Sequence, residues 1–277
     1  MIVESRDCGN TLVLKRSVMK KIEFYLAIFL IGITVVACSA SGIERETSDN
    51  PPSHEIWDML TKKHVRANGM VDYKGFLNDK AKLQQYLDLL SNNAPDKTKW
   101  SREEQLAYWI NAYNAFTIKL IIDNYPLESI QDLHPTFKIP GVNTVWHKKF
   151  FKIGGEEASL DQIEHDILRK EFEEPRIHFA INCASFSCPP LRNEAFVADK
   201  LEKQLEEMAI QFINDNQRNQ ISANEAEVSK IFSWFTKDFT KKGSLREYLN
   251  KYSKVKLKEG ADIDYMDYDW SLNDVKP

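Results

Sequence analysis

The distribution of apolar residues predicts a chain that is mostly helical. Over 102–123 the apolar residues recur at intervals of three and four, which is the period of an α-helix with a buried face. Ser101 and Glu104 form a capping box at the start of this segment, and Pro126 follows its end. Further helices are expected over 54–67, 76–92, 160–171, 197–216, 244–252 and within 228–239.

Three short segments have patterns typical of strands. Residues 145–158 predict a hairpin, because an aromatic segment precedes a Gly154–Gly155 turn and a short return. The apolar run Ile177–Asn182 predicts a buried strand, and another strand is expected near 254–258. The expected fold class is therefore α+β, a helix-dominated single domain with a small antiparallel or mixed sheet.

The N-terminal segment has the features of a bacterial secretion signal. Phe24–Ala37 is an uncharged apolar stretch of 14 residues, which is short for a membrane span and suits a signal core. Lys20 and Lys21 precede it, and Met19 is a second candidate start that gives a more typical signal. The sequence Val35-Val36-Ala37-Cys38 resembles a lipobox, whose cysteine becomes a lipidated N-terminus.

These features predict a chain in three parts. Residues 1–37 are expected to be a signal peptide, 38–53 a lipid-anchored flexible tether, and 54–277 a single globular domain. The expected location is the bacterial cell envelope, with the membrane as a partner through the lipid on Cys38. Ser39 favours the outer membrane. A plain secretory signal and an uncleaved anchor are the alternatives.

Composition and charge exclude several functional classes. The 277 residues are 43% hydrophobic and 28% charged, which is typical of a globular protein. The net charge of −4 leaves no basic excess to neutralise phosphates, so no nucleic-acid partner is expected. The sequence contains no Walker loop and no GxGxxG, HExxH or GxSxG motif, and no cofactor is expected.

Reactive side chains are most concentrated between residues 178 and 192. In a regular strand His178 and Cys183 would face opposite sides, whereas Cys188 lies on the following loop and can fold back toward His178. A Cys188–His178 pair is therefore the easier thiol–imidazole pair. The polar side chains of the segment include His178, Asn182, Cys183, Ser185, Cys188 and Arg192.

Several interpretations of the two cysteines remain open. Cys183 and Cys188 form a disulfide, which the oxidising envelope favours, or they are buried as small apolar residues. Alternatively, one of them is a reactive thiol. A metal site with His178 is disfavoured because the C-x-x-C spacing of structural zinc sites is missing, so no metal is expected.

Two helical segments carry polar residues at short spacing. Asn111 and Asn114 lie three residues apart on the helix 102–123, where buried amides need partners. They either bond a neighbouring loop or orient a catalytic histidine, as in papain-type triads. Asp161 and His165 are four residues apart, which is typical of a surface ion pair.

The aromatic C-terminal tail has two interpretations. It either covers the core or lines a groove in which Trp270 and the carboxylate of Asp269 face a ligand.

Five motifs together resemble the uncharacterised family known as domain of unknown function 547. They are LAYWINAYNAF, SLDQIEHDILR, RIHFAINCASFSCPPLR, VSKIFSWFTKDF and YDWSLN, and the resemblance spans about 70–273. Bacterial members are often envelope lipoproteins. By analogy, the fold is expected to be remotely similar to papain- or transglutaminase-like enzymes. The resemblance implies these motif residues: Asn111, Asn114, His178, Asn182, Cys183, Ser185, Cys188, Pro189, Asp269 and Trp270.

Two functions are compatible with these residues. The first is a thiol hydrolase or acyltransferase for peptide or cell-wall material, with Cys188 or Cys183 as nucleophile and His178 as base. Asn111 or Asp269 would orient the base. The second is a non-catalytic envelope binding or assembly module with a structural Cys183–Cys188 disulfide and a peptide or glycan ligand. The expected binding residues are Asn114, Asn182, Ser185, Arg192 and Trp270.

Overall fold

A computed structural model describes residues 46–137 and 142–275. The chain divides after Glu44, and all the described residues belong to the second unit, Arg45–Pro277. The expected signal peptide 1–37, the lipidation site Cys38 and the first part of the expected tether lie outside the described residues. Within the described ranges, no helix combines the length and the apolar character that crossing a membrane requires.

The second unit is rich in helices with small sheets, which confirms the α+β class. Its α-helices are α2 (Glu55–His64), α3 (Tyr73–Asn78), α4 (Lys80–Asn92), α5 (Arg102–Ile122), α6 (Arg169–Phe172), α7 (Ile177–Ala180), α8 (Leu201–Ile213), α9 (Ile231–Trp234), α10 (Thr236–Phe239) and α11 (Leu245–Tyr252). Its other helices are the 3₁₀ turns η1 (Ile130–Leu133), η2 (Val145–His147) and η4 (Ala198–Lys200), and the π-helix η3 (Gln162–Leu168).

The strands form three separate small sheets. In the first, β1 (Thr47–Ser48) pairs in parallel with β2 (Ala94–Pro95). In the second, the hairpin of β3 (Phe151–Ile153) and β4 (Glu156–Ala158) confirms the predicted hairpin. The third has the order β5-β6-β7, with β5 (Gln220–Ile221) antiparallel and β7 (Asp262–Tyr265) parallel to β6 (Glu225–Val228).

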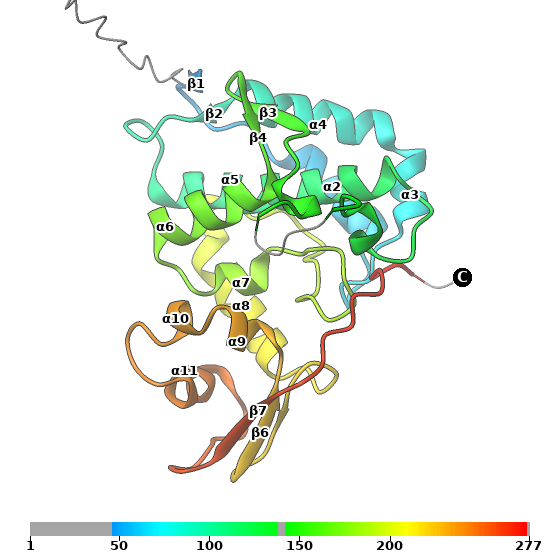
Figure 1. Cartoon of the computed structure of the whole chain (residues 1–277). Helices are drawn as coiled ribbons and strands as arrows, with labels where there is room; N and C mark the ends of the chain where they lie inside the picture. The colour runs from blue at the N-terminus through cyan, green and yellow to red at the C-terminus, as the bar shows by residue number, and fades with distance from the viewer. Residues whose placement is uncertain (1–45, 138–141, 276–277) are drawn as a thin grey trace, which may run out of the picture. The chain divides into compact units, whose positions relative to one another are not determined.

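Helix α5 is the centre of the hydrophobic core. Sixteen of its 21 residues are buried, because α3, α4 and η3 pack around it. The capping box of Ser101 and Glu104 is present as predicted. Figure 1 shows α2–α5 packed together, α9–α11 with β6 and β7 on the other side, and α7 and α8 between them.

Two strand predictions were wrong. Ile177–Ala180 is a short helix, in which the N–H of Ile181 donates to the carbonyl of Ile177 at 3.0 Å. A short apolar run fits a buried helix and a buried strand equally well, so periodicity alone could not separate them. The strand expected near 254–258 is instead found at β7, because parallel pairing with β6 selects Asp262–Tyr265.

The described part of the expected tether is packed against the domain. Thr47 and Ser48 pair with β2, and the carbonyl of Ser48 accepts a hydrogen bond from Trp100 Nε1 at 2.8 Å. The N–H of Glu46 donates to the carbonyl of Gly154 at 2.9 Å. The folded unit therefore begins before residue 54.

The C-terminal tail joins the two sides of the domain. After β7 the chain runs back toward the N-terminal helices, as the red segment in Figure 1 shows. Ser271 pairs with Ser129, Leu272 with Ser185, and Asp274 with Val71. This path brings the tail beside the loop that follows α7.

Candidate functional site

A pocket of about 240 Å³ opens where six segments meet. These are α5, η2, η3, the end of α7 with its following loop, α9 with Phe235, and the C-terminal tail. The residues that line it are Tyr113, Thr144, Trp146, His147, Asp161, Glu164, His165, His178, Ile181, Cys183, Cys188, Pro189, Ile231, Trp234, Phe235, Tyr268 and Trp270. Three of the predicted catalytic residues, His178, Cys183 and Cys188, therefore meet at one site, together with Trp270.

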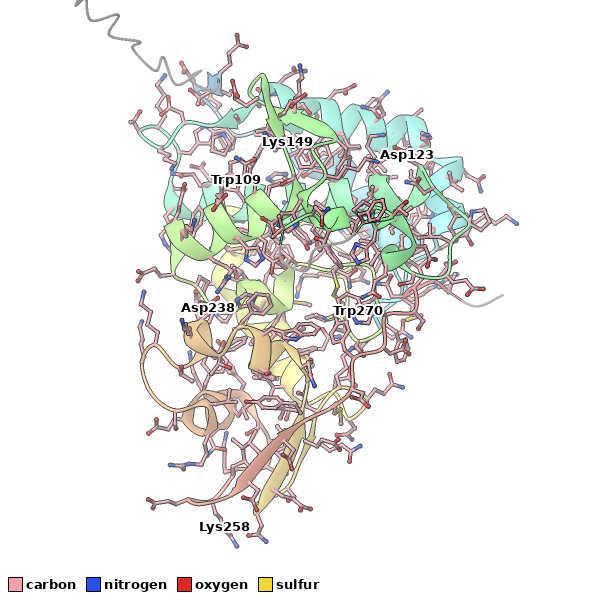
Figure 2. The ribbon with its side chains drawn as sticks, in the orientation of Figure 1. Trp109, Asp123, Lys149, Asp238, Lys258 and Trp270 are labelled. Carbon is pink, nitrogen blue, oxygen red and sulfur yellow. A yellow bond between two sulfur atoms is a disulfide. The ribbon has the colours of Figure 1, made fainter. Side chains whose placement is uncertain are left out.

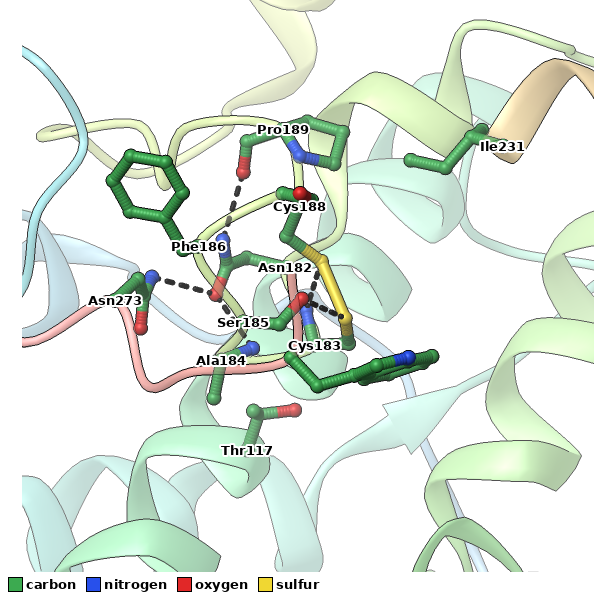
Figure 3. The surroundings of a disulfide bond; sticks show 12 residues. Thr117, Asn182, Cys183, Ala184, Ser185, Phe186, Cys188, Pro189, Ile231 and Asn273 are labelled. Atoms are coloured by element: carbon green, nitrogen blue, oxygen red, sulfur yellow. Dashed lines mark hydrogen bonds between the residues drawn. A yellow bond between two sulfur atoms is a disulfide. The ribbon is translucent and has the colours of Figure 1, made fainter. Parts of the chain in front are cut away.

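A disulfide between Cys183 and Cys188 closes the loop at the pocket wall (Figure 3). The two Cα atoms are 6.2 Å apart, within the usual range for a disulfide. The N–H of Cys183 donates to Cys188 Sγ at 2.9 Å, and Ser185 Oγ lies 3.2 Å from Cys183 Sγ. Of the alternatives that the sequence left open for the two cysteines, the structure has the disulfide.

Asn182 holds the loop in shape from inside (Figure 3). Its Nδ2 donates to the carbonyl of Pro189 at 2.7 Å, and its Oδ1 accepts the N–H of Ala184 at 2.9 Å. Oδ1 also accepts from Asn273 Nδ2 at 3.2 Å. Because Ala184 has a φ of 65°, a conformation that non-glycine residues rarely adopt, the loop depends on these fixed hydrogen bonds.

The two helix asparagines also bind backbone rather than a histidine. Asn114 donates from Nδ2 to the carbonyl of Ala180 at 2.9 Å and accepts the N–H of Asn182 at the same distance. Asn111 makes the same pair of bonds to the backbone of Phe196, at 2.8 and 3.0 Å. Both amides thus position the backbone of neighbouring segments.

Arg218 is a loop contact that sequence reasoning missed. Its buried guanidinium donates to the carbonyl of Cys188 at 2.8 Å and to that of Phe186 at 2.6 Å. No motif marks Arg218, because it lies 30 residues beyond the carbonyl that it binds. Together with Asn182, it accounts for the fixed path of the disulfide loop.

His178 pairs with a carboxylate that the sequence did not identify. Its Nε2 lies 2.7 Å from Asp238 Oδ2, and its ring stacks on Phe235 with centroids 4.0 Å apart. Asp238 also accepts two hydrogen bonds from Arg169, at 2.6 and 3.0 Å. Among the described residues, no hydrogen bond joins His178 to the sulfur of Cys183 or Cys188.

The environment keeps this pair as a neutral imidazole and an ionised carboxylate. Burial is the largest influence on His178 and lowers its pKa, outweighing the hydrogen bond to Asp238. For Asp238, partial burial opposes ionisation. Hydrogen bonds from His178 and Arg169 outweigh that effect and hold the pKa of the carboxyl well below its usual range.

The π-helix η3 turns polar side chains into the pocket. Asp161, Glu164 and His165 all line it, so the expected surface ion pair faces a cavity instead. His165 Nε2 lies 3.6 Å from Asp161 Oδ1, and His147 Nε2 lies 3.4 Å from the same oxygen. π-Helices are rare and occur often at functional sites. The i, i+4 spacing of Asp161 and His165 predicted that these two side chains lie close together, but it did not predict that they line a pocket.

Aromatic rings form another part of the pocket lining. Trp270 lies 4.5 Å from Tyr268, 5.7 Å from Trp146 and 5.8 Å from Trp234, measured between ring centroids. Tyr268 Oη accepts a hydrogen bond from Ser185 Oγ at 2.9 Å, which ties the tail to the disulfide loop. Figure 2 labels Trp270 on the tail and Asp238 on α10.

The remaining predicted residues lie outside the pocket lining. Asp269 accepts the N–H of Ser271 at 2.8 Å, and its own N–H donates to Ser187 Oγ at 2.9 Å. Arg192 pairs with Glu194 and with Glu207, the latter at 2.7 Å. Within the ranges 46–137 and 142–275, no group of three or more His, Cys, Asp or Glu side chains is placed to hold a metal ion.

One comparison with known proteins gives a result. Residues 97–213 match the model of a family described as "Protein of unknown function, DUF547", which confirms the resemblance over that part of the expected 70–273 span. The match covers α5, η3, α7 and the disulfide loop and ends before Asp238 and the aromatic tail. Searches of curated proteins and of solved structures gave no match.

Proposed function

Because the family matched by residues 97–213 is one of unknown function, we propose a function from the site itself. In this proposal the domain is a non-catalytic binding module that holds a peptide or glycan in the pocket. It acts in the bacterial envelope, where the lipid on Cys38 anchors it to the outer membrane. A ligand of this kind is the material that an envelope-anchored domain meets.

The observation that carries the proposal is the disulfide loop at the pocket wall. The two sulfurs that would serve as nucleophiles are bonded to each other. Asn111 and Asn114, which would orient a base, are occupied by backbone groups. A loop fixed by covalent and hydrogen bonds, facing a wall of tryptophan and tyrosine rings, is suited to holding a ligand without reacting with it.

A second function is favoured by one specific observation. His178, aligned by Asp238, lines the same pocket as both cysteines. If a dithiol reductant opened the disulfide, the pocket would contain two thiols and a neutral imidazole that could accept a proton. Thiol-dependent hydrolysis or acyl transfer on peptide or cell-wall material is therefore the alternative proposal.

Ligand binding is expected to change the emission of the pocket tryptophans. We would titrate the full chain, in detergent, with peptidoglycan-derived peptides and glycan fragments and follow tryptophan fluorescence. At least one class should bind reversibly. Trp270→Ala should weaken that binding by about tenfold or more, because a stacked aromatic contact contributes on the order of 1–3 kcal/mol.

The matched control is Tyr265→Ala. Tyr265 is an exposed aromatic residue on β7, five positions before Trp270, and it does not line the pocket. Its removal should leave the affinity unchanged. Cleavage of the ligand by the reduced chain, lost in Cys188→Ser, would favour the hydrolase over the binding module.

A further inference from the structure

The charged groups that line the pocket are of one sign. Two carboxylates, Asp161 and Glu164, project from the start of η3 and line it, and no lysine or arginine is among its described lining residues. The guanidinium of Arg169, which contacts the lining residue His165, is bound to Asp238 through two hydrogen bonds. The pocket therefore presents negative charge that the lining itself does not neutralise.

Within the described ranges, Glu164 makes no direct contact with a cationic side chain, although the charge of Arg169 acts on it from a distance. Among the described residues, its carboxylate accepts a hydrogen bond from the hydroxyl of Tyr113 at 3.3 Å. No salt bridge joins it to a described lysine, arginine or histidine. A half-buried carboxylate beside a cavity retains a free face for a ligand that carries the opposite charge.

Asp161 has two histidine neighbours, and hydrogen bonds at Nδ1 fix the orientation of both rings. His147 Nδ1 accepts the N–H of Thr144 at 3.3 Å, and His165 Nδ1 accepts from Arg169 Nη1 at 2.9 Å. Each ring therefore carries its hydrogen on Nε2, the atom nearest Asp161. The Nε2 atoms of these rings, at 3.4 and 3.6 Å from Oδ1, orient the carboxylate of Asp161.

The pocket lining also includes a cluster of aromatic rings. Trp146, Trp234, Tyr268 and Trp270 form one connected cluster with ring centroids 4.5–5.8 Å apart. Trp234 is 45% exposed, so its indole remains accessible at the rim. Indole and phenol rings attract cations through their negative faces, most strongly where water is displaced.

From this arrangement we propose that the pocket recognises an organic ammonium group. The cationic nitrogen lies toward Glu164 and Asp161, and the alkyl substituents pack on the tryptophan and tyrosine rings. A volume of about 240 Å³ suits such a head group rather than a whole peptide or oligosaccharide. The inference rests on the proposed ligand-binding function and narrows its ligand to one that carries an amine or a quaternary ammonium.

Two sources supply this chemistry: a lysine side chain in a peptide, and a choline-type lipid headgroup. The probes are therefore Nα-acetyl-lysine methylamide and choline, each titrated into the full chain in detergent at low salt. The neutral comparison is 3,3-dimethylbutan-1-ol, which has the shape of choline without its charge. Di-N-acetylchitobiose serves as a neutral sugar. Tryptophan emission and calorimetry are the two readouts.

At least one cation is expected to bind about tenfold or more tightly than the neutral alcohol, and the preferred cation identifies the source. Glu164→Gln should remove most of this preference. Trp234→Leu keeps an apolar side chain at an exposed position. This variant should weaken the binding of the cation more than the binding of the neutral alcohol. Glu157 is an exposed carboxylate of β4 outside the pocket, so Glu157→Gln should change the affinity for neither the cation nor the neutral alcohol.

Two results would overturn the inference, and they differ in what they mean for the proposed function. Equal binding of choline and its neutral analogue, or binding of chitobiose alone, would reject the ammonium ligand and leave a binding pocket. No response to any of the four probes would reject the ammonium ligand as well. The wider titration with envelope fragments then decides whether the pocket binds anything.

Discussion

Replacing Phe179 with alanine is expected to destabilise the protein by about 3–5 kcal/mol, the range for a buried phenylalanine. Phe179 is fully buried on α7 and stacks on Phe212 and Phe239 at 5.2 and 5.6 Å between centroids. Phe232 lies 5.8 Å away. The ring thus joins α7 to α8, α9 and α10, and the loss would be a large share of a typical domain's stability.

The measurement is urea denaturation of the full chain, followed by circular dichroism. Phe137→Ala is the matched control, because Phe137 is 86% exposed and its truncation should cost less than about 0.5 kcal/mol. A cost below about 1 kcal/mol for Phe179→Ala would show that this aromatic core is not packed as described.

The second large effect is expected at Asn182. Alanine at this position leaves the carbonyl of Pro189 and the N–H of Ala184 without their partners. Each buried group that loses its hydrogen bond costs about 1–3 kcal/mol, so we expect a loss of roughly 3 kcal/mol in the same urea experiment. The loop should also lose its fixed path, so ligand affinity should fall together with stability.

Asn216→Ala is the control for this variant. Asn216 is an exposed amide in the turn after α8, so its removal should change neither stability nor affinity appreciably. If Asn182→Ala had full stability but lost affinity, Asn182 would contact the ligand directly and would not be a positioning residue. Full stability with full affinity would contradict its role in the loop altogether.

The sequence predicted best where local signals decide the structure. Helix α5 was located by its capping box and its apolar period, and the β3–β4 hairpin by its glycine turn. The sequence also singled out the segment with both cysteines as the densest group of reactive side chains, and both cysteines line the pocket. In each case, the residues that determine the structure lie within about 20 positions of one another in the sequence.

Local patterns failed where distant segments decide. The partner of His178 is Asp238, 60 residues away, and no spacing rule connects them. The apolar run that contains α7 predicts a strand, because a run this short fits the period of a strand and of a helix equally well. The position of Trp270 depends on pairing of the tail with Ser129 and Ser185. Both are far from Trp270 in the sequence, so no local pattern predicts this pairing.

The central claim is that a disulfide-fixed loop forms the wall of a binding pocket. Its most direct test is to alkylate the full chain with and without prior reduction and map the labelled cysteines by mass spectrometry. The account predicts that Cys183 and Cys188 stay unlabelled until a reductant is added. Rapid labelling of either one near pH 6 without reductant would reveal a stabilised thiolate and contradict the account in favour of a thiol enzyme.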